Sequence, residues 1–230
     1  MSYLQCFCVK QSKLEDVCFS LATFNNEIDG IFRATEDSDD KDNILKLFPL
    51  NSGNVFVELG ESHYSADKYL EYISMKLARP VIYFLMGSDE LWFYELFVNG
   101  AKIDTMYSNL NVGLTDEERR IGKGSPGILA KYWNCDRRTI ENYYRNRGDL
   151  GKSELERKAY PEDKYEYWNE WQMTDFMNKL DIHYPYSENG VSLIFESYFM
   201  NNKYSQLEDY EEIIKKAWDE AFNEDLPDDW

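Results

Sequence analysis

Residues 79–108 read RPVIYFLMGSDELWFYELFVNGAKIDTMYS, and this stretch decides the fold. Three runs rich in β-branched and aromatic residues are separated by two turn signals, Gly-Ser-Asp at residues 87–89 and Asn-Gly at residues 99–100. Asn-Gly between apolar runs is typical of a two-residue type I′ turn, because both central residues of that turn need a positive φ. The stretch therefore predicts a three-stranded antiparallel meander on which the rest of the chain packs.

The middle run of the meander, residues 91–98, has two apolar faces. In a strand, Leu91, Phe93, Glu95 and Phe97 share one face, and the residues between them share the other. Mostly apolar faces predict a central strand with structure packed on both sides. Glu95 would then be either a buried carboxylate with a raised pKa or the partner of Lys102 across the hairpin.

Weaker patterns outline the remaining elements. Strands are expected at residues 3–9 and 54–59, and spacings of three and four predict helices over 12–24, 65–77, 165–180 and 207–222. Residues 31–33 fit a short strand or a loop, and 191–200 fit a strand or a helix. We expect an α+β fold, with an antiparallel sheet of about five or six strands built on residues 1–110 around a meander at 80–108. Residues 111–230 are expected to form a mainly helical region packed on the sheet as one compact unit.

Local signals in the second half mark two helix starts. Thr115 and Glu118 have the spacing of a capping box, and Ser125-Pro126 is typical of an N-cap followed by proline in the first turn. The glycine-rich residues 122–127 lack the spacing of a phosphate-binding loop, so a break between two helices explains them more simply.

The charge balance is strongly acidic, with 43 Asp and Glu against 25 Lys and Arg, a net charge of −18. Such a chain repels nucleic acid and anionic membranes. Residues 119–152 are an exception, with nine basic and three acidic residues among several aromatics. This segment could hold a single nucleic-acid strand, but pairing of its charge with acidic parts of the same molecule is the preferred interpretation.

Neither a metal site nor a catalytic centre is predicted. Cys6 and Cys8 share a strand face, yet the four cysteines form no Cys-x-x-Cys pair and only His63 and His183 could join them. Neither histidine lies in a nucleophile or triad motif, so we assign no catalytic residue, no metal ligand and no cofactor. No apolar run is long enough to span a membrane and the N-terminus lacks the features of a signal peptide, so a cytoplasmic location is expected.

Residues 92–100 (Trp-Phe-Tyr-Glu-Leu-Phe-Val-Asn-Gly) and 103–108 resemble a hairpin module of uncharacterised bacterial proteins, which has a Tyr-x-Leu-aromatic strand and a turn glycine. Residues 124–130 are similar to the short helix that follows in that family. Residues 171–182 are similar to a later helix ending in Leu-Gly-Ile, although Asp181 replaces the glycine here. The resemblance covers residues 80–182; because that family has no assigned activity, it implies an expected fold and identifies no active-site residues.

A looser likeness, in composition, is to immunity proteins of bacterial polymorphic-toxin systems, which are acidic α+β proteins that act by binding. It implies a non-enzymatic cytoplasmic protein that binds a basic partner protein by electrostatic steering. The alternative is a hydrolase with an acidic, metal-assisted cleft acting on a phosphorylated or sugar substrate. Two dense acidic clusters are the candidate partner-binding residues: Asp37, Asp39, Asp40 and Asp42, and Glu208, Asp209, Glu211 and Glu212.

Overall fold

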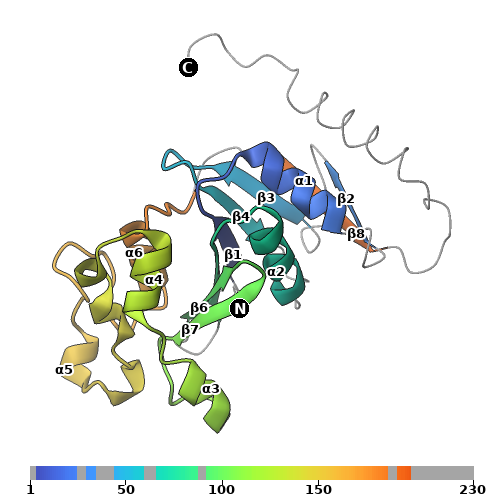
Figure 1. The fold of residues 1–230 in the computed structure, drawn as a ribbon. Helices are drawn as coiled ribbons and strands as arrows, with labels where there is room; N and C mark the ends of the chain where they lie inside the picture. Colours follow the sequence, from blue (N-terminus) through green and yellow to red (C-terminus); the bar gives the residue numbers. More distant parts are fainter. Residues whose placement is uncertain are drawn as a thin grey trace.

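The computed structural model describes residues 4–24, 30–34, 44–59, 66–87, 92–185 and 191–197. Its body is one antiparallel sheet of eight strands, in the spatial order β2-β8-β3-β4-β1-β5-β6-β7 (Figure 1). The strands are β1 (Leu4–Val9), β2 (Gly30–Ala34), β3 (Ile44–Pro49), β4 (Val55–Leu59), β5 (Val81–Met86), β6 (Trp92–Val98), β7 (Ala101–Tyr107) and β8 (Val191–Ser197).

Helices cover both faces of this sheet. On one face lie α1 (Leu14–Phe24) and α2 (Ala66–Lys76), whose apolar residues share a core with Phe7, Tyr83 and Phe97. On the other face lies the helical region, residues 108–185, which packs on Cys6, Phe84 and neighbouring side chains. Its elements are α3 (Asp116–Ile121), α4 (Pro126–Trp133), η3 (Arg137–Thr139), η4 (Glu141–Tyr144), η5 (Arg147–Asp149), α5 (Lys152–Leu155) and α6 (Gln172–Lys179).

The predicted meander is present as β5, β6 and β7. Val98 pairs with Ala101, so the turn has two residues, and both Asn99 (φ 51°) and Gly100 (φ 81°) have positive φ, as a type I′ turn requires. The Ser74 hydroxyl accepts a hydrogen bond from the Gly100 N–H (2.9 Å), which ties the turn to α2. The two-sided burial of β6 is also confirmed, since Trp92 faces the helical region and Phe97 faces α1 and α2.

The α+β class with an antiparallel sheet is confirmed, and the sheet extends beyond residues 1–110. Residues 191–197, whose pattern fitted either a strand or a helix, form β8. This strand lies between β2 and β3 and pairs antiparallel with both. Two ambiguous segments thus become strands because each supplies backbone hydrogen-bonding partners to the other, a long-range effect that local patterns do not encode.

The helical region follows its capping signals, with one correction. Thr115 and Glu118 form the capping box, and Ser125 caps α4 with Pro126 in the first turn. The helix predicted over residues 165–180 is wrong in its first half, because α6 begins only at Gln172. The preceding residues are held by other bonds: the carboxylate of Asp175 accepts from the backbone N–H groups of Lys164 (2.9 Å) and Tyr165 (2.7 Å). The helix predicted over 207–222 lies outside the described residues.

An aromatic cluster joins the helical region to the sheet. Phe176 on α6 is fully buried, and its ring stacks on that of Tyr94 in β6 with centroids 5.6 Å apart. The rings of Trp92 (5.3 Å) and Tyr143 (5.2 Å) contact the same side chain. Burial of several aromatic rings around one residue fixes α6 on this face of the sheet. None of the described helices has the length and apolar character needed to cross a membrane.

Candidate functional site

The candidate partner-binding residues Asp37, Asp39, Asp40, Asp42, Glu208, Asp209, Glu211 and Glu212 all lie outside the described residues. The strands that adjoin them are described. The first cluster lies between the end of β2 at Ala34 and the start of β3 at Ile44, and the second follows the end of β8 at Ser197. β8 lies between β2 and β3, so the strands that precede these two clusters in the sequence, β2 and β8, are neighbours in the sheet, and the second cluster begins 11 residues after Ser197. Figure 1 shows β2 and β8 side by side at this edge of the sheet.

The negative charge of the chain is concentrated in the segments that precede or follow these strands in the sequence. We call residues 25–29, 35–43 and 198–230 the acidic segments; together they contain 17 acidic and 4 basic residues. The residues that the structure describes contain 22 acidic and 21 basic residues, so they are almost neutral. The net charge of −18 therefore comes mostly from segments that adjoin β2, β3 and β8.

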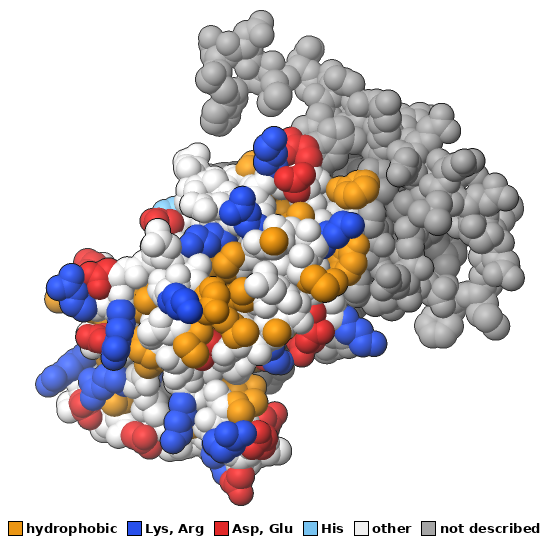
Figure 2. Space-filling view, in the orientation of Figure 1, with side chains coloured by type: hydrophobic (Ala, Val, Ile, Leu, Met, Phe, Trp, Pro, Cys, Tyr) orange, Lys and Arg blue, Asp and Glu red, His pale blue; other side chains and the backbone are white. Residues whose placement is uncertain are grey.

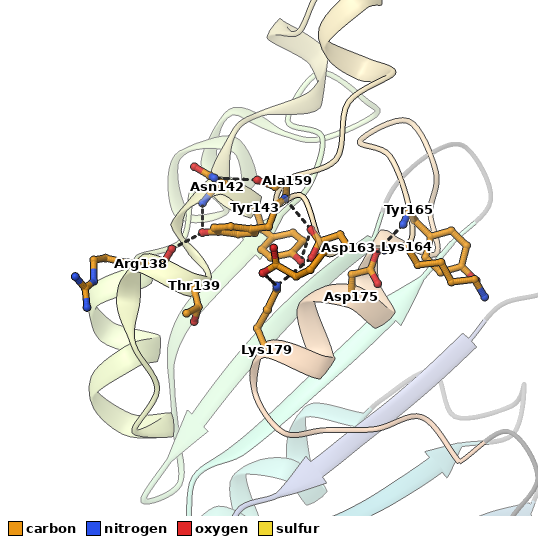
Figure 3. Close-up of polar contacts among 12 residues, drawn as sticks. Arg138, Thr139, Asn142, Tyr143, Ala159, Asp163, Lys164, Tyr165, Asp175 and Lys179 are labelled. Atoms are coloured by element: carbon orange, nitrogen blue, oxygen red, sulfur yellow. Dashed lines mark hydrogen bonds and ion pairs between the residues drawn. The ribbon is translucent and has the colours of Figure 1, made fainter.

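A buried carboxylate organises the polar interior of the helical region (Figure 3). Asp163 accepts hydrogen bonds from the Tyr143 hydroxyl (2.7 Å) and from the Tyr160 backbone N–H (3.0 Å), and it forms an ion pair with Lys179 on α6 (3.1 Å). Nearby, the Tyr160 hydroxyl donates to the backbone carbonyl of Arg138 (2.7 Å), and the Asn142 side chain donates to that of Ala159 (2.9 Å). These bonds fasten residues 156–165 to η3, η4 and α6.

The protonation states in this network suit a structural role. Burial and the hydrogen bond to Asp163 raise the pKa of Tyr143, so the phenol stays protonated and donates. Burial alone would lower the pKa of Lys179, but its bonds to Glu162 and Asp163 outweigh this and raise the pKa. The phenol of Tyr143 and the ammonium of Lys179 are thus each held in the form that completes a bond inside the protein.

A second buried network lies where the meander meets the helical region. The Tyr94 hydroxyl donates to the carboxylate of Asp104 on β7 (2.6 Å) and is 2.7 Å from the Tyr144 hydroxyl. The Ser125 N–H also donates to Asp104 (3.2 Å), so the carboxylate anchors the start of α4. Burial raises the pKa of Asp104, although these hydrogen bonds oppose the shift. This network also joins structural elements, and no local pattern of residues predicts it.

The two interpretations of Glu95 are both correct. Lys102 lies 2.8 Å from its carboxylate, across the hairpin, and 3.0 Å from Asp67 at the start of α2. Burial nevertheless raises the pKa of Glu95, against the opposing effect of Lys102. The ammonium of Lys102 occupies the space between the two carboxylates, so this cluster is an internal salt bridge.

Several arginines of the basic segment, residues 119–152, form ion pairs with acidic residues that lie nearby in the sequence. Arg119, Arg120, Arg138 and Arg145 form ion pairs with Asp116, Glu117, Asp136 and Glu154, at 3.1, 2.6, 2.7 and 2.6 Å. Basic and acidic side chains accordingly alternate over the helical region in Figure 2. Such a mixed surface provides no continuous cationic track for a nucleic-acid backbone.

The thiols and the described histidine form no catalytic group. Cys6 and Cys8 are buried on the same side of β1, and burial raises the pKa of each thiol well above its ordinary value. His183 is exposed, with Nδ1 2.9 Å from the Asn178 side-chain oxygen, and His63 lies outside the described residues. Within the described ranges, no three His, Cys, Asp or Glu residues are grouped as metal ligands would be.

An open depression of about 470 Å³ lies where the β1–α1 turn meets the turn before β5. Lys13, Asp16 and Arg79 lie on its lining and are exposed to solvent.

Comparison with known proteins finds no relative: no family model matches the chain, and neither a curated protein nor a solved structure shows significant similarity.

Proposed function

We propose that this protein is a non-enzymatic binding protein of the immunity type, which binds a basic partner protein through its acidic segments. One observation supports the proposal: β8 lies between β2 and β3, so the strands that precede or follow the acidic segments in the sequence are neighbours at one edge of the sheet. Those segments hold 17 acidic and 4 basic residues, whereas the described residues are nearly neutral.

The separation of charge has a direct electrostatic consequence. A nearly neutral body joined to strongly negative segments attracts a cationic protein and orients it toward those segments during approach. Such steering raises the association rate more than it strengthens the final complex. Added salt screens the charges and so weakens the steering. The polar networks around Asp163 and Asp104 give separate support to a binding role. Their side chains form hydrogen bonds and ion pairs that hold the fold together.

The test is the association rate of the partner, first captured from the native host and then purified. Changing Asp37, Asp39, Asp40 and Asp42 to Asn should slow association markedly at low salt. The difference should shrink as the Debye length falls from about 30 Å at 0.01 M to about 8 Å at 0.15 M. The matched control neutralises four exposed acids of the helical region, Asp116, Glu117, Asp149 and Glu156, and leaves the rate nearly unchanged.

Two outcomes would contradict the proposal. An equal loss of rate in the test and control variants would show that only total charge matters. A partner without a basic surface would remove the electrostatic mechanism altogether. The same tests on Glu208, Asp209, Glu211 and Glu212 separate the contributions of the two clusters.

A further inference from the structure

The open depression between the β1–α1 turn and the turn before β5 holds two cations that no described residue neutralises. Lys13 and Arg79 both line it, and neither side chain forms an ion pair or a hydrogen bond with another described residue. In the helical region, by contrast, the guanidinium groups of Arg120 and Arg138 bind carboxylates at 2.6 and 2.7 Å. Asp16 is the acidic residue on the lining, so the two cations outnumber it. The depression therefore offers positive charge to a ligand.

Hydrogen bonds between three turns fix the shape of this depression. The Lys10 N–H donates to the Pro80 carbonyl (3.0 Å), which joins the β1–α1 turn to the turn before β5. The buried side chain of Asn54 accepts from the Gln11 N–H (3.0 Å), which joins the β1–α1 turn to the β3–β4 turn. Every residue of the three turns is described: 10–13, 50–54 and 77–80. The lining thus belongs to a framework that is held together within the described ranges.

Two residues of these turns have an unfavourable backbone conformation. Five described residues other than glycine have a positive φ, and three of them are Asn or Asp, which tolerate it. The other two, Gln11 (φ 45°) and Ala78 (φ 49°), lie in the turns that carry Lys13 and Arg79. Strained residues persist where the surrounding structure fixes them, and they gather at binding sites. The strain therefore favours a functional role for this depression.

We propose that the depression binds the phosphate group of a small phosphomonoester. The planar fork of Arg79 suits two phosphate oxygens, and the ammonium of Lys13 adds a point charge. Its volume of about 470 Å³ lies in the range of small-molecule sites, and Leu77 gives the carbon part of the ligand an apolar contact. Because the net charge of −18 repels polyanions, a small ligand fits better than nucleic acid. This site uses no residue of the acidic segments, so it is independent of the proposed function.

Calorimetry on the full chain tests the site with three probes at constant ionic strength. Glycerol phosphate carries the phosphate and a carbon portion, inorganic phosphate carries the charge alone, and glycerol is the uncharged control. We expect glycerol phosphate to bind with a dissociation constant of about 1 mM or lower, the affinity that two charge-assisted hydrogen bonds provide. Inorganic phosphate should bind more weakly, and glycerol should not bind.

Matched variants locate the contact. Lys13→Gln and Arg79→Gln should each weaken glycerol phosphate binding about tenfold, because each removes one charge-assisted hydrogen bond. Both should keep the melting temperature, since the side chains are exposed. Asp16→Asn removes a like charge from the lining and should tighten binding. The controls Lys152→Gln and Arg157→Gln remove the same two residue types from exposed positions of the helical region and should leave binding unchanged.

Several results would overturn the proposal. Absence of binding at about 10 mM glycerol phosphate, ten times the expected constant, would rule the site out. Equal losses in the test and control variants would show that only total charge acts. Glycerol that binds as tightly as its phosphate would remove the role of the phosphate group. Nuclear magnetic resonance gives the location: amide shifts of Gln11, Ser12 and Gly53 should move on titration, and shifts confined to other residues would place the ligand elsewhere.

Discussion

Replacing Phe176 by alanine should test whether the sheet and the helical region are one folding unit. Phe176 is fully buried on α6, and its ring contacts those of Trp92, Tyr94 and Tyr143 at centroid distances of 5.2–5.6 Å. Loss of a buried phenylalanine side chain costs about 3–5 kcal/mol of unfolding free energy. We expect the upper part of this range, because rigid neighbouring rings cannot close the cavity and each aromatic pair adds about 0.5–1.5 kcal/mol.

Urea unfolding, followed by far-UV circular dichroism and tryptophan fluorescence, measures this loss. If the two regions form one unit, both signals should change in a single transition, at a lower urea concentration in the variant. Phe176→Leu keeps most of the side-chain volume and should lower the free energy of unfolding by about 1.5 kcal/mol or less. Trp168→Ala, at a side chain that is 51% exposed, should lose about 0.5 kcal/mol or less. A loss below about 1.5 kcal/mol for Phe176→Ala would refute the packing argument. Separate transitions in the native protein would refute the single unit.

Three further changes have defined outcomes. Gly100→Val should destabilise the fold by about 1–3 kcal/mol, because φ is +81° and a Cβ would lie 3.2 Å from the Met75 Cβ; an unchanged melting temperature would contradict this. Because burial raises the pKa of Glu95, the folded state holds that proton more tightly, so stability should fall as pH rises above the unfolded pKa of about 4.3. Glu95→Gln should flatten that part of the stability–pH curve, and an unaltered slope would show that the shift is absent. Cys135, which is only partly buried, should react with a thiol reagent before the three buried cysteines do, and mass spectrometry after brief labelling would reveal any other order.

Local sequence signals determined the elements that are stabilised by residues close to one another in the sequence. The Asn99-Gly100 turn, the two apolar faces of β6, and the caps at Thr115 and Ser125 all follow from residue types within a few positions of one another. The turn depends on the backbone strain of a positive φ, the two faces of the strand on its two-residue period, and the caps on the unpaired N–H groups at the start of a helix. The capping and turn rules therefore needed no knowledge of the rest of the molecule.

Only the tertiary structure decided the features that join distant parts of the chain. β2 and β8 become strands because each completes the hydrogen bonds of the other. Residues 165–171 leave the predicted helix because the N–H groups of Tyr167 and Trp168 donate instead to the carbonyls of Arg157 and Leu155. The contacts of Asp163 with Tyr143 and Lys179 span 20 and 16 residues, and no residue pattern specifies such pairings. The acidic clusters could be read from the sequence, but the strands that precede them in the chain are neighbours only because of the strand order, which long-range pairing alone sets.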